Sequence, residues 1–212
     1  MIFLADNDII LKFSCLGLHD FFVRWLSSRN ACVSYLGTLP GQLRNNSKWK
    51  ETYSAETLLR AQQLIERPEW SILGNMTDKT LLQTLTAIPG IDPGERVLYA
   101  NLRDDAETIV LSGDKRCMKA LAKAQLDDIY QIRIQKKTIC FEQILESIIN
   151  EQSFSKTLAA IIDFQGCDKT ISILFSHGTQ SSEGEVRRGL LSYINDLKKN
   201  APGILVDNVQ VD

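Results

Sequence analysis

Short apolar runs that end in polar residues recur along the first 136 residues, and each has the length of a buried β-strand. Runs at residues 2–5, 31–35 and 107–111 are predicted as strands, and residues 70–73 as a third short strand or a connector. Runs without polar alternation are typical of strands covered on both faces, as in a parallel sheet. Residues 129–134 alternate between apolar and polar, which predicts an edge strand.

Between these runs, apolar residues recur three and four positions apart, which is the spacing of amphipathic helices. The predicted helices cover residues 9–15, 18–27, 54–67, 77–85, 92–104 and 115–124. Residues 37–50 are rich in Gly, Pro, Asn and Ser and predict a loop or a short irregular helix. Strands that alternate with helices predict a three-layer α/β/α fold with a mostly parallel central sheet over residues 1–136.

The pattern changes at residue 137, after which helical spacing dominates. Helices are predicted at residues 138–150, 154–164, 170–175 and 185–197, with a flexible link at 178–184 and a strand only at 203–206. Residues 137–212 are therefore predicted to form a helical C-terminal extension. Its helices carry apolar stripes typical of core residues, formed by Ile144, Ile148, Leu158, Ile161, Ile162, Leu190, Leu191 and Ile194.

Composition is that of an ordinary globular protein, with 44% hydrophobic and 24% charged residues and a net charge of −2. Binding to nucleic acid would need local basic patches, because the chain as a whole is not basic. No apolar run is long enough to span a bilayer, and residues 1–5 lack the basic start of a signal peptide. We expect a cytoplasmic protein that makes no contact with a membrane.

The cysteines are odd in number and widely spaced, which argues against a disulfide framework or a zinc cluster. They are Cys15, Cys32, Cys117, Cys140 and Cys167, and we expect small apolar core residues in a reducing compartment. The two histidines, His19 and His177, share no ligand-like spacing.

Acidic residues follow the predicted strands at the positions where a site would form. Asp6 and Asp8 follow the first strand, Asp114 follows the strand at 107–111, and Asp92 and Glu95 open a helix. Polar groups at the carboxyl ends of strands in an α/β sheet converge on one crevice. We therefore expect Asp6, Glu95 and Asp114 to meet, although each acid could instead only cap a helix.

Clustered carboxylates are the ligands that hard divalent cations prefer, so the sequence predicts a site for Mg²⁺ or Mn²⁺. The predicted ligands are Asp6, Asp92, Glu95 and Asp114, with Asp8 as an alternative fourth acid. Such an ion can both activate water and neutralise charge in phosphodiester hydrolysis.

The segments DPGERVLYA, at residues 92–100, and IVLSGDKRCMKALA, at residues 109–122, resemble the PIN domain. The resemblance covers about residues 1–135 and implies a metal-dependent ribonuclease that leaves 5′-phosphate and 3′-hydroxyl ends. It implies catalytic roles for Asp6, Glu95 and Asp114, and it places Asp92 as an extra acid of one branch of the family. Asn7 stands where the family often has Thr or Ser. The chain departs from the family at residues 36–40, which lack the glutamate often found after the second strand.

Basic and polar residues near the acids are candidates for contacts with RNA. Asn7, Lys115 and Arg116 are predicted to bind substrate, although Lys115 and Arg116 could equally form a solvated helix face. Arg44, Lys48 and Lys50 surround Trp49, which could stack on a base; an ordinary surface loop is the alternative.

Two other functions fit parts of the sequence. Asp6 and Asp8 match the opening of haloacid dehalogenase-like phosphatases, with Asp6 as nucleophile and Asp8 as acid/base. A PIN-like fold with an incomplete acid set could instead be a binding module. Many bacterial PIN domains are toxins held by an antitoxin, so the resemblance implies a toxin-like or defence ribonuclease whose C-terminal helices contact an antitoxin-like protein or a second copy.

Overall fold

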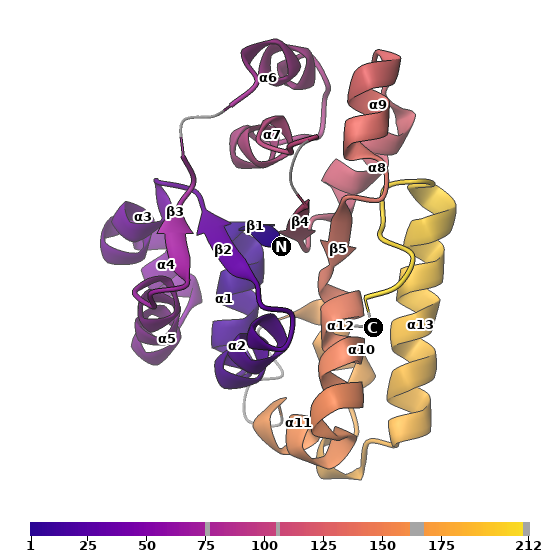
Figure 1. Ribbon diagram of the computed structural model, residues 1–212. Coiled ribbons are helices and arrows are strands. Elements are labelled where there is room, and N and C mark those ends of the chain that lie inside the picture. Colours follow the sequence, from indigo (N-terminus) through magenta and orange to yellow (C-terminus); the bar gives the residue numbers. More distant parts are fainter. Residues whose placement is uncertain (75–76, 105–106, 162–167, 210–212) are drawn as a thin grey trace.

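Five parallel strands form the central sheet of the computed structural model, which describes residues 1–74, 77–104, 107–161 and 168–209 (Figure 1). The strands are β1 (Ile2–Ala5), β2 (Cys32–Tyr35), β3 (Trp70–Ile72), β4 (Thr108–Ser112) and β5 (Thr138–Cys140), in the spatial order β3-β2-β1-β4-β5. In the register of the central strands, Leu4 of β1 lies beside Ser34 of β2 and Val110 of β4.

Helices connect all of the strands, as parallel pairing requires. Those before β4 are α1 (Asn7–Cys15), α2 (His19–Ser27), α3 (Leu39–Asn45), α4 (Ser47–Thr52), α5 (Ala55–Ile65), α6 (Lys79–Thr86) and α7 (Pro93–Ala100). Those after β4 are α8 (Lys115–Lys123), α9 (Asp128–Ile134), α10 (Phe141–Gln152), α11 (Phe154–Ile161), α12 (Lys169–Leu174), the 3₁₀ turn η2 (Gly178–Gln180) and α13 (Glu183–Asn200).

Alternate residues of the strands face two separate cores, because side chains along a strand point to opposite faces. Phe3 and Ala5 join the core that α1, α2, α5 and α10 cover. Leu4 and Val110 join the core that α6, α7 and α8 cover. The three-layer α/β/α architecture expected from the sequence is therefore confirmed.

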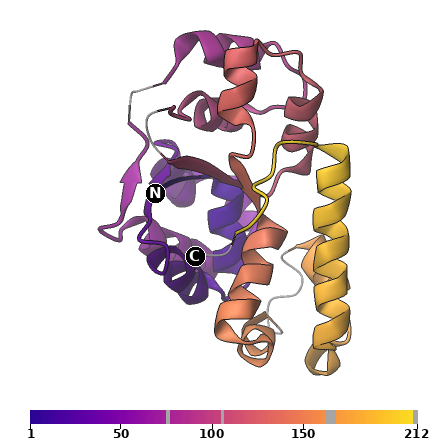
Figure 2. The same cartoon turned by 45° about the vertical axis from the view of Figure 1, so that its right-hand side comes forward.

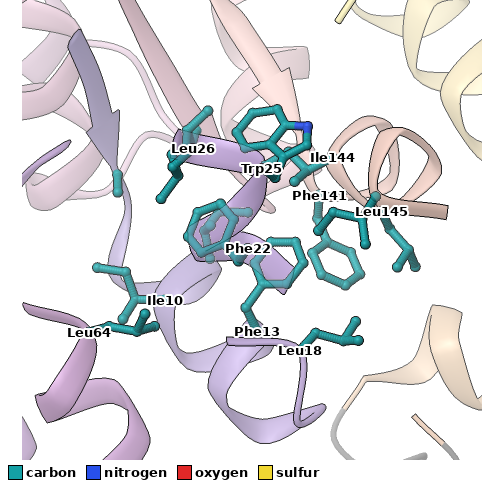
Figure 3. Close-up of a cluster of buried hydrophobic side chains, with 14 of the residues drawn as sticks. Ile10, Phe13, Leu18, Phe22, Trp25, Leu26, Leu64, Phe141, Ile144 and Leu145 are labelled. Carbon is teal, nitrogen blue, oxygen red and sulfur yellow. The ribbon is translucent and has the colours of Figure 1, made fainter. Parts of the chain in front are cut away.

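Aromatic side chains fill the first core and connect the two parts of the chain (Figure 3). The ring centroids of Phe13 and Phe22 lie 4.4 Å apart, and those of Phe13 and Phe141 lie 5.2 Å apart. The indole Nε1 of Trp25 donates a hydrogen bond of 3.0 Å to Ser147 Oγ on α10. The start of the C-terminal extension is thus packed into the same core as the first two helices.

Helices α10 and α13 lie side by side and form one side of the molecule (Figures 1 and 2). Their predicted apolar stripes are used within the chain itself, since Ile144, Ile148, Leu190 and Ile194 are buried. Leu191 is an exposed member of the set. The predicted helix at 154–164 is present as α11 to Ile161, and its remaining residues, including Ile162, lie outside the described chain.

The edge strand predicted at residues 129–134 is wrong, because this segment is helix α9. Tyr130 and Ile134, four residues apart, both contact the second core, as one face of a helix allows. Ile129 and Ile132 are 60% and 70% exposed, so the apolar alternation does not mark a buried face.

The helix predicted from residue 138 begins three residues too early, because Thr138, Ile139 and Cys140 form β5. This strand is buried throughout and passes directly into α10, where Gln143 Oε1 accepts a hydrogen bond of 3.0 Å from the Cys140 backbone N–H. The strand expected at 203–206 is present only as a parallel bridge between Leu205 and Thr138.

The prediction of free, buried cysteines holds for Cys117 and Cys140 but is wrong for two others. Cys32 is exposed, and Cys15 is disulfide-bonded. Cys167 lies outside the described residues. Within the described ranges, none of the helices has the length and apolar character needed to cross a bilayer.

Candidate active site

The sheet reverses its direction of winding between β1 and β4, and ligands of open α/β sheets bind beyond the carboxyl ends of the strands at such a point. A cavity of about 990 Å³ lies there. Its wall contains four acids, Asp6, Asp8, Asp92 and Asp114. The chain segments that follow β1 and β4 are held together by a backbone hydrogen bond of 3.0 Å from Asp6 N to Leu111 O.

Asp6 directly follows β1 and occupies the position before the first residue of α1. Its side chain makes no capping hydrogen bond to the helix, although its residue type and position favour one. The residue is only 8% exposed. Burial, followed by repulsion from Asp8, Glu95 and Asp92, raises the pKa of Asp6 to about 8. Asp6 is thus a carboxyl group without a capping role, held where negative charge is costly.

Asp92 and Glu95 form a reciprocal capping box at the start of α7. Asp92 Oδ1 accepts from Glu95 N at 2.8 Å, and Glu95 Oε2 accepts from Asp92 N at 2.9 Å. Glu95 is 1% exposed, and its Oε1 is buried without a hydrogen bond of good geometry from any described residue. Burial is the main cause that raises the pKa of Glu95 to about 7, while the Asp92 backbone N–H and the Cys117 thiol favour its ionised form.

Asp114 caps α8, which begins one residue after it. Its Oδ1 accepts from the backbone N–H of Arg116 at 2.7 Å, and its Oδ2 pairs with the Arg116 guanidinium at 2.7 Å. Burial alone would raise the pKa of Asp114, but the hydrogen bonds and the charge of Arg116 hold the pKa below its ordinary value. Asp114 is therefore ionised at neutral pH.

Asp8 lines the cavity but is engaged by a neighbouring cation. Lys12 Nζ lies 3.0 Å from Asp8 Oδ2 and 3.1 Å from Asp168 Oδ2. Gly113 makes this arrangement possible, because a Cβ atom there would lie 2.8 Å from Lys12 Nζ and closer still to Asp8 Oδ2. Asp168 thus connects the C-terminal part of the chain to the cavity wall through Lys12.

The residues predicted to bind substrate occupy different surroundings. Asn7 lines the cavity and donates to Gln42 Oε1 at 2.9 Å. Lys115 pairs with the buried Glu142 at 2.6 Å, and Arg116 pairs with Asp114. Neither Lys115 nor Arg116 is among the lining residues.

Sequence reasoning missed Thr38, Gln42 and Tyr53 in the cavity wall, and it also missed Glu142. Tyr53 is four residues after Trp49, which is the spacing that brings two side chains to one helix face. That spacing is the signal from which Tyr53 could have been found. The contribution of α3 depends on tertiary packing and leaves no comparable signal.

Within the described chain, no group of three or more His, Cys, Asp or Glu residues is arranged to hold a metal ion. Asp92, Glu95 and Asp114 each direct an oxygen to a backbone amide, and Asp114 also pairs with the Arg116 guanidinium. The donor chemistry nevertheless fits a hard divalent cation, which prefers oxygen ligands. Such an ion would satisfy Glu95 Oε1, which has no well-placed donor among the described residues, and the carboxyl of Asp6, which caps no helix amide.

No protein-family model matches the chain, and comparisons with curated proteins and with solved structures returned no match. The site itself therefore carries the functional argument.

Proposed function

We propose that this chain is a metal-dependent, PIN-type endoribonuclease of the cytoplasm that hydrolyses RNA phosphodiesters with Mg²⁺ or Mn²⁺. One observation carries the proposal: Asp6 and Glu95 are buried carboxyls close enough to interact, since the charge of Glu95, after burial and the charge of Asp8, helps to raise the pKa of Asp6. Buried like charges are unfavourable unless a cation neutralises them. Perturbed carboxyls beside a cavity are typical of functional sites.

The three acids have different parts in this proposal. Asp114 is ionised before any ion enters and provides the initial attraction for a cation. Asp6 and Glu95, with pKa values of about 8 and 7, release protons as the ion binds. When bound, the ion supplies an activated water and relief of charge on the phosphate. Asp92, which lines the cavity, holds Glu95 at the start of α7 through the capping box.

The test is cleavage of labelled RNA with Mn²⁺ or Mg²⁺, comparing the wild type with Asp6→Asn and Glu95→Gln. We expect metal-dependent products with 5′-phosphate ends, and a loss of about 100-fold or more in each variant. Calorimetry of Mn²⁺ binding in buffers of different ionisation enthalpy should show proton release at pH 7. Cleavage that survives both substitutions would remove these carboxyls from the reaction.

A phosphatase is the second candidate, because Asp6 and Asp8 line the same cavity two residues apart. The ion pair between Asp8 and Lys12 disfavours it, since an acid/base catalyst must exchange protons freely. Hydrolysis of p-nitrophenyl phosphate that Asp8→Asn abolishes, without cleavage of RNA, would favour the phosphatase. RNA binding without any hydrolysis would favour a binding module.

A further inference from the structure

Two aromatic side chains share the cavity wall with the acids. Trp49 of α4 and Tyr53, which ends that helix, both line the cavity and are only half-buried. The backbone N–H of Tyr53 donates a hydrogen bond of 2.8 Å to Trp49 O, so the end of the helix brings the two residues together. Tyr53 lies close enough to Asp8, Lys12 and Asp168 for these charges to influence its pKa, which burial raises. The aromatic surface thus borders the acidic end of the cavity.

A metal site alone does not require a cavity of this size. The volume of about 990 Å³ is at the upper end of the range for small-molecule sites, roughly 300–1,000 Å³. The cavity wall also contains the side-chain amides of Asn7 and Gln42, and Asn7 Oδ1 is buried without a partner among the described residues. An aromatic face beside amide groups suits a nucleobase, which has a flat π-face and a polar edge.

A second groove, of about 480 Å³, adjoins Tyr53. Tyr53 lines both, and the second groove also contains Arg44 and Lys50. Both cations are exposed, and no described residue forms an ion pair with either. Asp6, Asp8, Asp92 and Asp114 line the first groove, and no described acid lines the second. The second groove therefore offers positive charge of the kind that binds phosphates.

We propose that Trp49 and Tyr53 form a base-stacking subsite next to the scissile phosphate, and that Arg44 and Lys50 hold the following phosphates of a single RNA strand. This inference rests on the proposed function, since it assigns the strand path of that same site. A duplex does not fit it, because the bases of a duplex are stacked on one another and present no free face.

Binding can be measured without cleavage in EDTA, using the full chain and a short fluorescent uridine oligonucleotide. Trp25 and Trp70 are buried, so among the three tryptophans Trp49 is the one whose ring a base can reach. We expect the oligonucleotide to quench tryptophan emission. Trp49→Phe keeps a stacking ring and should bind within about threefold of wild type without quenching, whereas Trp49→Leu should bind about tenfold more weakly. Equal binding by wild type and Trp49→Leu would overturn the subsite.

Thermal unfolding of both variants accompanies these measurements, because Trp49 also packs against the core. The comparison of Phe with Leu separates stacking from packing, since both replacements are apolar. A folded Trp49→Phe protein that binds as weakly as Trp49→Leu would also overturn the proposal.

Contacts with phosphates can be measured separately, because they make the affinity for RNA depend on the salt concentration. Each of Arg44→Gln and Lys50→Gln should reduce the slope of log K against log salt by about 0.7. Lys199→Gln is the matched control, because Lys199 is exposed at the end of α13, a helix that lies beyond the β5 edge of the sheet, whereas α3 and α4 lie by the β3 edge (Figure 1). An unchanged slope in both test variants would exclude them from the strand path.

Failure of this inference and failure of the proposed function give different results. Metal-dependent RNA cleavage with unchanged binding by Trp49→Leu would leave the nuclease and remove the subsite. Quenching and salt-dependent binding without cleavage in Mn²⁺ would leave the subsite and remove the nuclease.

Discussion

Asp92 and Glu95 hold each other at the start of α7, with hydrogen bonds of 2.8 and 2.9 Å that run in opposite directions between side chain and backbone. The pair stabilises the helix and orients Glu95 at the same time. It uses one oxygen of Glu95 and leaves the other buried without a hydrogen bond of good geometry from any described residue. The same residue is therefore a cap and a candidate ligand, and substitutions can separate the two roles.

Glu95→Gln should retain the cap and lose the charge. The amide oxygen can still accept from Asp92 N, so we expect the free energy of unfolding to stay the same or rise as a buried charge is removed. Cleavage of RNA should fall by about 100-fold or more. Asp92→Ala is the complementary variant and should lose about 1 kcal/mol of stability with the cap. A large loss of stability in Glu95→Gln would show that its charge supports the fold.

The metal-free protein should become less stable as the pH rises from about 4 to about 8. Folding raises the pKa of Asp6 from 3.8 to about 8 and that of Glu95 from 4.5 to about 7. Across this window the native state keeps protons that the unfolded chain has lost, so the free energy of unfolding falls with pH. Each unit of pKa difference between the folded and unfolded states corresponds to about 1.4 kcal/mol in the free energy of unfolding.

Thermal unfolding in EDTA at pH 5 and pH 8 measures this effect, with about 2–4 °C expected per kcal/mol for a chain of this size. Asp6→Asn is the control and should lose most of the pH dependence. Saturating Mn²⁺ should restore stability at pH 8 in the wild type. A melting temperature of the metal-free wild type that rises between pH 5 and pH 8 would contradict the raised pKa values.

Arg116→Ala should bind Mn²⁺ about two- to fivefold more tightly than the wild type, because it removes the cation that occupies Asp114 Oδ2. Arg116 is 84% exposed, so the melting temperature should change little. Titration with Mn²⁺ provides the measurement. Arg116→Lys keeps the charge, so its affinity for Mn²⁺ should lie between those of the wild type and Arg116→Ala. Weaker binding of Mn²⁺ by Arg116→Ala would contradict a ligand role for Asp114.

Gly113→Ala should disturb the cavity wall, because the added methyl group would collide with Asp8 and Lys12. The nearest atoms end flexible side chains, so we expect a loss of at most about 1 kcal/mol in denaturant unfolding as the ion pair between Asp8 and Lys12 is displaced. Gly41→Ala is the matched control in α3, where a Cβ atom meets nothing within 4 Å. It should stabilise the protein by about 0.5–1 kcal/mol. Equal stability of the two variants would show that Asp8 and Lys12 move aside freely.

The strands at residues 2–5 and 107–111 could be predicted because each contains an uninterrupted run of at least three apolar residues and is followed closely by an acid of the site. The acids could be placed for the same reason, since the carboxyl ends of parallel strands share one edge. The hydrogen bonds of these acids could not be predicted, because an Asp at such a position can either cap a helix or bind a cation. Asp6 and Asp114 show this, as the first does not cap and the second does.

The errors arose in segments too short for periodicity to decide. Six residues of α9 fit both an alternating strand and a helix with Tyr130 and Ile134 on one face. Three residues of β5 run into α10 without a loop, so no Gly or Pro marks the boundary. The cavity wall from α3 and α4 depends on how distant segments pack, which no local pattern encodes.

The outer edge of β5 receives its hydrogen bonds from the far end of the described chain, through Thr138 N to Ile204 O at 3.2 Å and Val206 N to Thr138 O at 2.8 Å. During synthesis, a ribosome must therefore deliver residue 206 before this edge has its partners. Pairings between residues so distant in sequence form slowly. Until then the strand exposes free amides and carbonyls, and a nascent chain is most open to intermolecular pairing there.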